Sequence, residues 1–290
     1  MSDSGWTVTG ADGQPIIGNT ETPSNDADPR GVALILHGFL GYKDYGMFPR
    51  LARELADSGF IAHRFNLSHS GMTNAVESFE RPDLFERDTW NKQVFDVDAV
   101  VGAIQKEAIA GAGLPYVLFG HSRGGATALL AAGRRFRDDR APFPAGVIAA
   151  STPSATCRFP EGIQQQLLEQ GYYEVKSNRT GQILRVGRQW LVEQRDQPED
   201  HDLTALVSQL QCPVLFIHGA DDPTVPARDA SALAQAATAA PSVGTRIIEG
   251  GDHVFNTPNP MPEDASPSPQ FEALVEACRE FLDHAVGAAS

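Results

Sequence analysis

Short apolar segments alternate with amphipathic ones along most of the chain, and this alternation restricts the possible folds more than any other feature. Residues 31–38, GVALILHG, form an apolar run that ends in glycine, which is typical of a strand buried on both faces. Residues 90–109 instead place Val94, Val97 and Val101 on one face of a helix. Strands separated by helices of this length predict a mainly parallel sheet with helices on both faces. Strands are predicted at 31–38, 60–66, 115–120, 145–151, 212–219 and 243–250, and helices at 46–58, 90–109, 123–135, 226–239 and 271–286.

Three segments depart from this alternation. Residues 6–10 and 14–19 predict a short hairpin at the N-terminal end. Residues 152–211 separate two consecutive strands by far more than one helix, so we predict a helical cap inserted there, with residues 1–151 and 212–290 forming the core. Residues 258–269 are rich in proline and predict a surface loop.

Composition excludes several classes of partner. The 290 residues carry a net charge of −14, which argues against nucleic acid and anionic membrane surfaces, because both would be repelled. No stretch approaches the roughly 20 apolar residues of a membrane helix, and the first 15 residues lack the basic and apolar parts of a signal peptide. Cys157, Cys212 and Cys278 fit neither a disulfide framework nor a zinc site. We therefore expect free thiols and a cytoplasmic location, while the sequence carries no signal for an oligomeric state.

One turn between a predicted strand and a predicted helix carries a serine in the pattern G-x-S-x-G. Residues 120–124 read Gly-His-Ser-Arg-Gly and follow the apolar strand directly. Glycines at both ends let strand and helix approach closely, so that the oxygen of Ser122 projects above the sheet near the positive end of the helix. Ser122 is the candidate nucleophile. The alternative is a glycine-rich turn with an incidental serine.

With this turn the sequence resembles the α/β-hydrolase superfamily over nearly the whole chain. The resemblance implies the α/β-hydrolase fold and the chain order nucleophile, acid, histidine. Residues 218–226, HGADDPTVP, resemble the family segment H-G-x-x-D-x-x-V-P, whose acid corresponds to Asp222, with Asp221 as the alternative. The family places its histidine on the loop after the last strand, where His253 lies. His284 also follows Asp222, but it falls in the last predicted helix.

A second loop supplies candidate oxyanion donors. Residues 37–41, His-Gly-Phe-Leu-Gly, resemble the family's H-G-aromatic loop. The resemblance implies an oxyanion hole made by the backbone N–H groups of Phe39 and Arg123. His37 is expected to brace the loop rather than to react.

Weaker signals lie at 64–71, RFNLSHSG, where many relatives carry D-x-R-G-x-G. Here Asn66 replaces the acid and Ser68 the arginine, so we favour loop-bracing hydrogen bonds over substrate contacts for His69 and Ser70. This loop and the G-H-S-R-G-G turn resemble a bacterial subgroup similar to dienelactone hydrolases, feruloyl esterases and S9 peptidases.

The predicted cap has its own polar and aromatic residues. Residues 177–182, SNRTGQ, could line a pocket mouth or a solvated surface. We favour a small cap core over a pocket wall for the aromatic side chains of the insertion. These are Phe159, Tyr172, Tyr173 and Trp190.

The residues and the resemblance together predict a serine hydrolase that cleaves carboxylic esters of small or medium acyl or aryl groups through an acyl-enzyme. The expected partner is a small-molecule ester, and no metal or organic cofactor is needed. Alternatives are a peptidase or a carbon–carbon hydrolase with the same residues, or a catalytically silent binding protein. If part of the negative charge rims the pocket, anionic substrates would be disfavoured.

Overall fold

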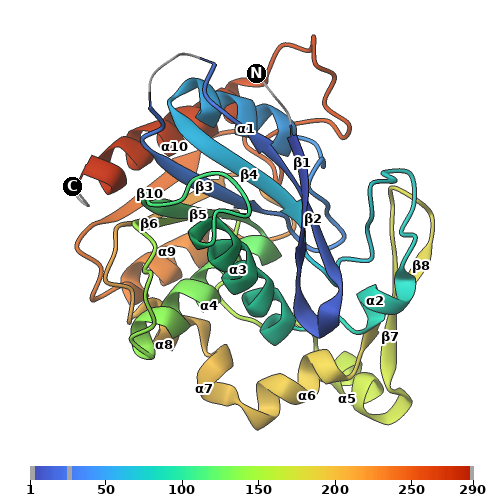
Figure 1. Ribbon diagram of the computed structural model, residues 1–290. Helices are drawn as coiled ribbons and strands as arrows, with labels where there is room; N and C mark the ends of the chain where they lie inside the picture. Colours follow the sequence, from blue (N-terminus) through green and yellow to red (C-terminus); the bar gives the residue numbers. More distant parts are fainter. Residues whose placement is uncertain (1–3, 25–27, 288–290) are drawn as a thin grey trace.

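An eight-stranded sheet forms the centre of the computed structural model, which describes residues 4–24 and 28–287 (Figure 1). The strand order is β1-β2-β4-β3-β5-β6-β9-β10. β2 pairs antiparallel with β1 and β4, and the pairs from β4 to β10 are all parallel. This confirms the N-terminal hairpin and the mainly parallel sheet. The strands are β1 (Ser4–Thr9), β2 (Pro15–Glu21), β3 (Gly31–Leu36), β4 (Phe60–Asn66), β5 (Tyr116–His121), β6 (Gly146–Ala150), β9 (Val214–Gly219) and β10 (Val243–Ile248).

Helices cover both faces of the sheet because the inner strands are apolar on both sides. In β3, Leu34 and Leu36 pack into one hydrophobic cluster, and Ile35 packs into the other. The first cluster includes residues of α3, α4, α8 and α9, and the second includes residues of α1 and α10. The core helices are α1 (Phe48–Asp57), α2 (Pro82–Glu86), α3 (Trp90–Gln105), α4 (Arg123–Arg137), α9 (Arg228–Ala236) and α10 (Pro269–Gly287), with a 3-10 turn at Ala11–Gly13.

The inserted segment contains four helices and also a pair of strands that we did not predict. β7 (Tyr172–Lys176) and β8 (Ile183–Gly187) form an antiparallel hairpin. Their aromatic and β-branched residues suit strands, and Gly181 takes a φ of 73° in the turn between them. The helices are α5 (Glu161–Gln170), α6 (Gln189–Asp196), α7 (Pro198–His201) and α8 (Leu203–Val207).

The last of these helices lies against the core. α8 packs on α4, where a Cβ added to Gly133 would lie 2.6 Å from the carbonyl oxygen of Leu206. The α5–β7–β8–α6 part of the insertion projects from the carboxyl end of the parallel strands (Figure 1). The division at residues 152–211 stays a prediction, since α8 is shared with the helix layer of the core.

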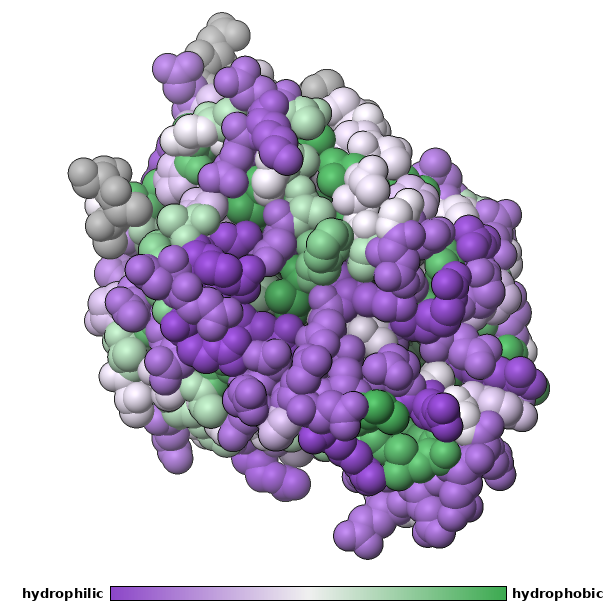
Figure 2. Space-filling model, turned by 60° about the horizontal axis from the view of Figure 1, so that its bottom comes forward, coloured by the Kyte–Doolittle hydropathy of each residue, from purple (hydrophilic) through white to green (hydrophobic). Residues whose placement is uncertain are grey.

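The surface in Figure 2 is mostly hydrophilic, with hydrophobic residues gathered in small patches. Residues 258–268 form no helix or strand, which agrees with their proline content. None of the described helices combines the length and the apolar composition that crossing a membrane requires.

Candidate active site

Ser122 occupies a tight turn between β5 and α4. Its φ of 55° and ψ of −123° are strained for a residue with a side chain. A Cβ added to Gly120 would lie 2.2 Å from the carbonyl oxygen of Gly124, and one added to Gly124 would lie 2.4 Å from that of His37. Both clashes are with backbone atoms, so the two glycines of the motif are required by close packing around the serine.

Three residues from three loops form one hydrogen-bonded chain. The Nε2 atom of His253 lies 3.0 Å from Oγ of Ser122, and its Nδ1 lies 2.7 Å from Oδ2 of Asp222. Asp221 is exposed and takes no part, and His284 is exposed on α10. The structure therefore brings together the three residues that the sequence selects and separates the two alternatives from them.

The Asp222 carboxylate is held by four donors. Its Oδ1 accepts hydrogen bonds from the amides of Thr224 and Val225, at 2.8 and 2.9 Å. Its Oδ2 faces Nε2 of His218 at 3.2 Å as well as the ring of His253. Burial by itself would raise the pKa of Asp222, but the hydrogen bonds from His218 and His253 hold that pKa well below its usual range. Asp222 is therefore an anion that fixes the orientation of His253.

His218 is a site residue that the sequence analysis missed. Its side chain is fully buried, and Nε2 also lies 2.9 Å from the carbonyl oxygen of Val225. It opens the segment that contains Asp222, so its position at the end of β9 is the signal that could have identified it. Its role is to hold the turn that carries the carboxylate.

Two other buried histidines hold the loops around Ser122. His37 donates from Nδ1 to the carbonyl of Gly38 at 2.9 Å and accepts at Nε2 from the amide of Leu67 at 3.2 Å. His121 donates from Nε2 to the carbonyl of His253 at 2.7 Å. Burial lowers the pKa of His37 to about 4 and that of His121 to about 3, so both rings are neutral at pH 7. His37 braces its loop, as predicted.

The backbone N–H groups of Phe39 and Arg123 flank the serine without an internal partner. Within the described residues neither amide donates a hydrogen bond to another protein group. Gly38 lies close to the serine, since a Cβ added to it would be 3.1 Å from Cβ of Ser122. Two free amides beside the candidate nucleophile match the arrangement expected for an oxyanion site, which stays a prediction.

Comparison with protein families agrees with this arrangement. The model of the alpha/beta hydrolase family matches residues 33–265, which is most of the chain. The chain belongs to the α/β-hydrolase family. No curated protein matches the sequence.

Several solved structures share the fold of this α/β hydrolase. Est1E from Butyrivibrio proteoclasticus with ferulic acid bound superposes with a TM-score of 0.71 at 20% identity, covering 97% of this chain and 99% of that one. The esterase domain of a Rhodothermus marinus protein gives 0.63 at 20% identity, with 97% and 100% covered. A puromycin-hydrolysing peptidase from Mycobacterium tuberculosis gives 0.66 at 16% identity, with 98% and 39% covered. At these identities the likeness shows the fold.

A cavity of about 440 Å³, called here the serine cavity, opens at Ser122 of this α/β hydrolase. Its walls come from both the core and the insertion, and four of the 13 lining residues are aromatic. Phe159 and Trp190 of the insertion line it and also contact each other, with ring centroids 5.1 Å apart. These two side chains therefore belong to the cap core and to the cavity wall together. The full lining is Phe39, Trp90, Ser122, Arg123, Pro153, Ala155, Thr156, Arg158, Phe159, Val186, Trp190, Thr224 and Val225.

The loop at 64–71 supports the fold rather than the cavity. Asn66 accepts from the amide of Lys43 at 2.7 Å. His69 is buried, with Nδ1 2.8 Å from Oγ of Ser68 and Nε2 3.3 Å from Asp12. Ser70 accepts from the amide of Met72 at 3.3 Å. These hydrogen bonds agree with the loop-bracing interpretation for His69 and Ser70.

The polar segment at 177–182 attaches the β7–β8 hairpin to the core. The side chain of Gln182 binds both the N–H and the carbonyl of Phe79, at 2.8 and 3.1 Å. Arg179 also places its guanidinium over the rings of Tyr42 and Phe79. Neither Gln182 nor Arg179 lines the serine cavity.

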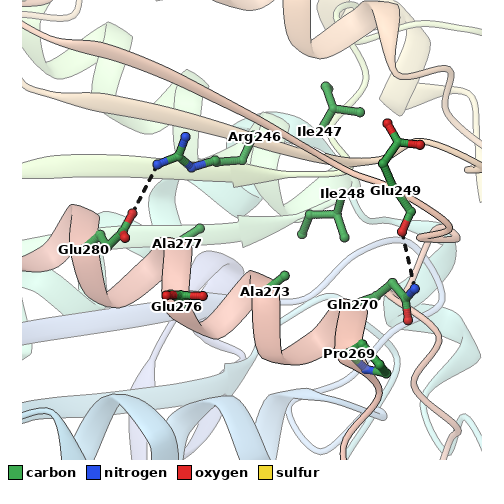
Figure 3. Close-up of a pocket in the computed structure, with 10 residues that line it drawn as sticks. All are labelled: Arg246, Ile247, Ile248, Glu249, Pro269, Gln270, Ala273, Glu276, Ala277 and Glu280. Atoms are coloured by element: carbon green, nitrogen blue, oxygen red, sulfur yellow. Dashed lines mark hydrogen bonds and ion pairs between the residues drawn. The ribbon is translucent and has the colours of Figure 1, made fainter.

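A second cavity, of about 490 Å³, lies between β10 and α10, and we call it the edge cavity (Figure 3). Arg246 binds Glu280 at 3.2 Å across one end, and Gln270 binds the carbonyl of Glu249 at 3.3 Å at the other (Figure 3). It contains no serine, cysteine or histidine. In the part of the chain that the structure describes, no group of three or more His, Cys, Asp or Glu could hold a metal ion.

Proposed function

We propose that this α/β hydrolase cleaves carboxylic esters of small or medium acyl or aryl groups through an acyl-enzyme. The observation that carries the proposal is the continuous chain from Ser122 through His253 to Asp222, with distances of 3.0 and 2.7 Å. The anionic Asp222 accepts the Nδ1 proton, so Nε2 of His253 is free to accept the proton of Ser122.

The reaction follows from these positions. Oγ of Ser122 attacks the ester carbonyl while Nε2 of His253 takes its proton. The amides of Phe39 and Arg123 bind the oxyanion of the tetrahedral intermediate. Collapse breaks the carbon–oxygen bond, and His253 gives the proton to the departing alcohol. Water then attacks the acyl-enzyme with His253 as base, which releases the acid and restores Ser122.

The size of the serine cavity favours small-molecule esters over long polymeric substrates. A volume of about 440 Å³ with aromatic walls suits a substrate of small-molecule size. Two of the solved structures above are an esterase bound to ferulic acid and an esterase domain, which favours the same substrate class.

A peptidase with the same three residues is the second candidate. The likeness to a puromycin-hydrolysing peptidase is the observation that favours it. Amide and ester hydrolysis need the same nucleophile, base and oxyanion donors, so turnover of matched aminoacyl esters and amides separates the two. Clear preference for the amide would replace the ester proposal.

Labelling by a fluorophosphonate probe tests the nucleophile directly. We expect wild-type protein to be labelled and Ser122→Ala to be unlabelled, because the probe phosphonylates an activated serine oxygen. His253→Ala should lose both labelling and hydrolysis of 4-nitrophenyl acetate, and His284→Ala serves as the matched control. Absence of labelling in the wild type would contradict the proposal and support a silent binding protein. Equal labelling in Ser122→Ala would contradict the proposal by showing that another residue reacts with the probe.

A further inference from the structure

The serine cavity carries only positive formal charge in its lining, although the chain as a whole has a net charge of −14. Among its 13 lining residues, Arg123 and Arg158 are the only ones with an ionised side chain at neutral pH, and none is a carboxylate. Negative charge around the pocket would disfavour anionic substrates. The residues that line the serine cavity carry no such charge. Arg158 belongs to the insertion, and Arg123 follows the nucleophile.

Arg123 is held by rings rather than by hydrogen bonds. Its guanidinium lies 4.7 Å from the ring centroid of Trp90 and 5.7 Å from that of Trp190. Nη2 lies 3.0 Å from Oδ2 of Asp88, yet neither Nη2 nor Nε has a hydrogen-bond geometry to any group, although both are buried. Nη1 also donates to no group in the described residues and is not among the buried atoms, and Arg123 is one of the residues that line the cavity.

Arg158 is freer still. Its side chain is 42% exposed, and its nearest carboxylate, Asp229, is 3.8 Å away. Asp229 accepts instead from the amide of Ser154 at 3.1 Å. Within the described part of the chain the guanidinium of Arg158 makes no hydrogen bond, so its donors are available to a ligand in the cavity.

Two arginines of α4 outside the cavity show guanidinium groups with their donors in use. Nε and Nη2 of Arg134 both bind the carbonyl of Asp200, at 2.9 and 2.6 Å. Arg135 binds Asp98 at 3.0 Å and the carbonyl of Pro142 at 3.0 Å. Nε of Arg179 and Nε of Arg279 are also buried without a partner, but Nη1 of Arg179 donates to the carbonyl of Val76 and Nη2 of Arg279 donates to Glu54. Among the described residues no hydrogen bond is made by the guanidinium of Arg123 or of Arg158. The buried donors of Arg123 lack a protein partner, and such donors call for a ligand or ion that completes them.

We propose that the serine cavity selects esters that carry a planar apolar body and a free carboxylate, which Arg158 and Arg123 bind while the ester group lies at Ser122. This inference rests on the esterase function proposed above and names its substrate class. A guanidinium matches a carboxylate in charge and geometry, and water exclusion by aromatic walls strengthens the interaction. The rings of Trp90, Phe159 and Trp190 give the apolar body its contact surface.

Two matched pairs of esters test this specificity, one with the carboxylate on the acyl part and one with it on the alcohol part. Monomethyl terephthalate is compared with methyl 4-methylbenzoate, and 4-acetoxybenzoate with 4-methylphenyl acetate. In each pair a carboxylate replaces a methyl group on a rigid ring. We expect kcat/KM of wild-type protein at low salt to favour the anionic member of at least one pair by about 10- to 100-fold, the effect of a hydrogen bond to a charged group.

Substitutions of Arg158 test whether this cavity residue causes the preference for anionic esters. Arg158→Gln should reduce the ratio of anionic to neutral kcat/KM at least fivefold, mainly through KM, and Arg158→Lys should retain part of it. Arg185→Gln is the matched control, because Arg185 is 47% exposed on β8, pairs with Glu174 and lies outside the cavity lining. Circular dichroism establishes that each variant is folded.

Two results would overturn the inference while leaving the esterase proposal intact. One is a ratio of 1 or less for both pairs in wild-type protein that hydrolyses the neutral esters. The other is an unchanged ratio in folded Arg158→Gln. Absence of Ser122-dependent turnover for all four esters would overturn the proposed function and this inference with it.

Discussion

The serine cavity and the edge cavity differ in chemistry rather than in size. Their volumes are about 440 and 490 Å³. In the edge cavity, Arg246 is bound to Glu280, and both side chains are more than half exposed. In the serine cavity, two arginines lack hydrogen bonds, and the serine sits at a φ of 55°. Unsatisfied donors and backbone strain mark a functional site, while the volume of a cavity does not.

The largest effect that tests this comparison is expected at Asp222. Asp222→Asn should lower kcat for 4-nitrophenyl acetate by about 10⁴-fold, because an amide cannot select the His253 tautomer that accepts the serine proton. Asp221→Asn is the matched control, since the side chain of Asp221 is exposed and makes no hydrogen bond to His253. Full activity in Asp222→Asn, measured by steady-state kinetics, would remove the chemical distinction between the two cavities.

A second contrast concerns the glycines beside each cavity. A Cβ at Gly124 would lie within 2.4–2.5 Å of the carbonyl oxygens of His37 and Leu36. A Cβ at Gly244 on β10 would instead meet the end of the Leu215 side chain at 2.9 Å, which can move. Gly124→Ala should therefore lower the free energy of unfolding by about 1–3 kcal/mol, and Gly244→Ala by less. Equal losses in denaturant titrations would show that the backbone around Ser122 is not unusually tight.

The sheet and the turn that carries Ser122 could be predicted because each leaves a pattern in the sequence. β3 is an unbroken apolar run, and the glycines around Ser122 are needed by contacts between adjacent elements. His253 followed from its place after the last strand. Asp222 and His253 were assigned through the family resemblance, which supplies the chain order and the loops that carry them.

What could not be predicted depends on contacts between distant segments. The aromatic walls of the serine cavity join Trp90 on α3 to Trp190 on α6, and the sequence does not show that they meet. The sequence did not identify Arg158 as a cavity residue, because no sequence pattern shows whether a guanidinium has hydrogen-bond partners. The β7–β8 hairpin was missed since an insertion of this length was read as helical throughout.

Low pH should reduce the stability of the region around Ser122, because buried histidines lie there. No histidine lines the edge cavity. Burial lowers the pKa of His121 from 6.5 to about 3, so the unfolded chain binds a proton at this residue first as the pH falls. Its contribution to stability is complete above about pH 6.5 and is lost progressively below it, by about 2 kcal/mol at pH 5. Asp88 and Asp96 act in the opposite direction, because burial raises the pKa of each to about 6.

A variant isolates the histidine from these carboxyl groups. His121→Gln keeps an amide donor but cannot titrate, so its free energy of unfolding should fall less than that of the wild type between pH 7 and pH 5. The expected difference is about 2 kcal/mol, measured by guanidinium titration at each pH. Parallel behaviour of the two proteins would mean that His121 is not held neutral by burial.

The smallest effect is expected in the edge cavity itself. Arg246→Gln removes the ion pair with Glu280. The side chain of Arg246 is 60% exposed and that of Glu280 is 58% exposed. Solvent screens such a pair, so the free energy of unfolding should change by less than about 0.5 kcal/mol, and kcat/KM for the esters above should stay the same. If Arg246→Gln altered turnover or the ratio of anionic to neutral kcat/KM, the edge cavity would be coupled to Ser122. The distinction between a satisfied arginine and an unsatisfied one would then no longer separate the two cavities.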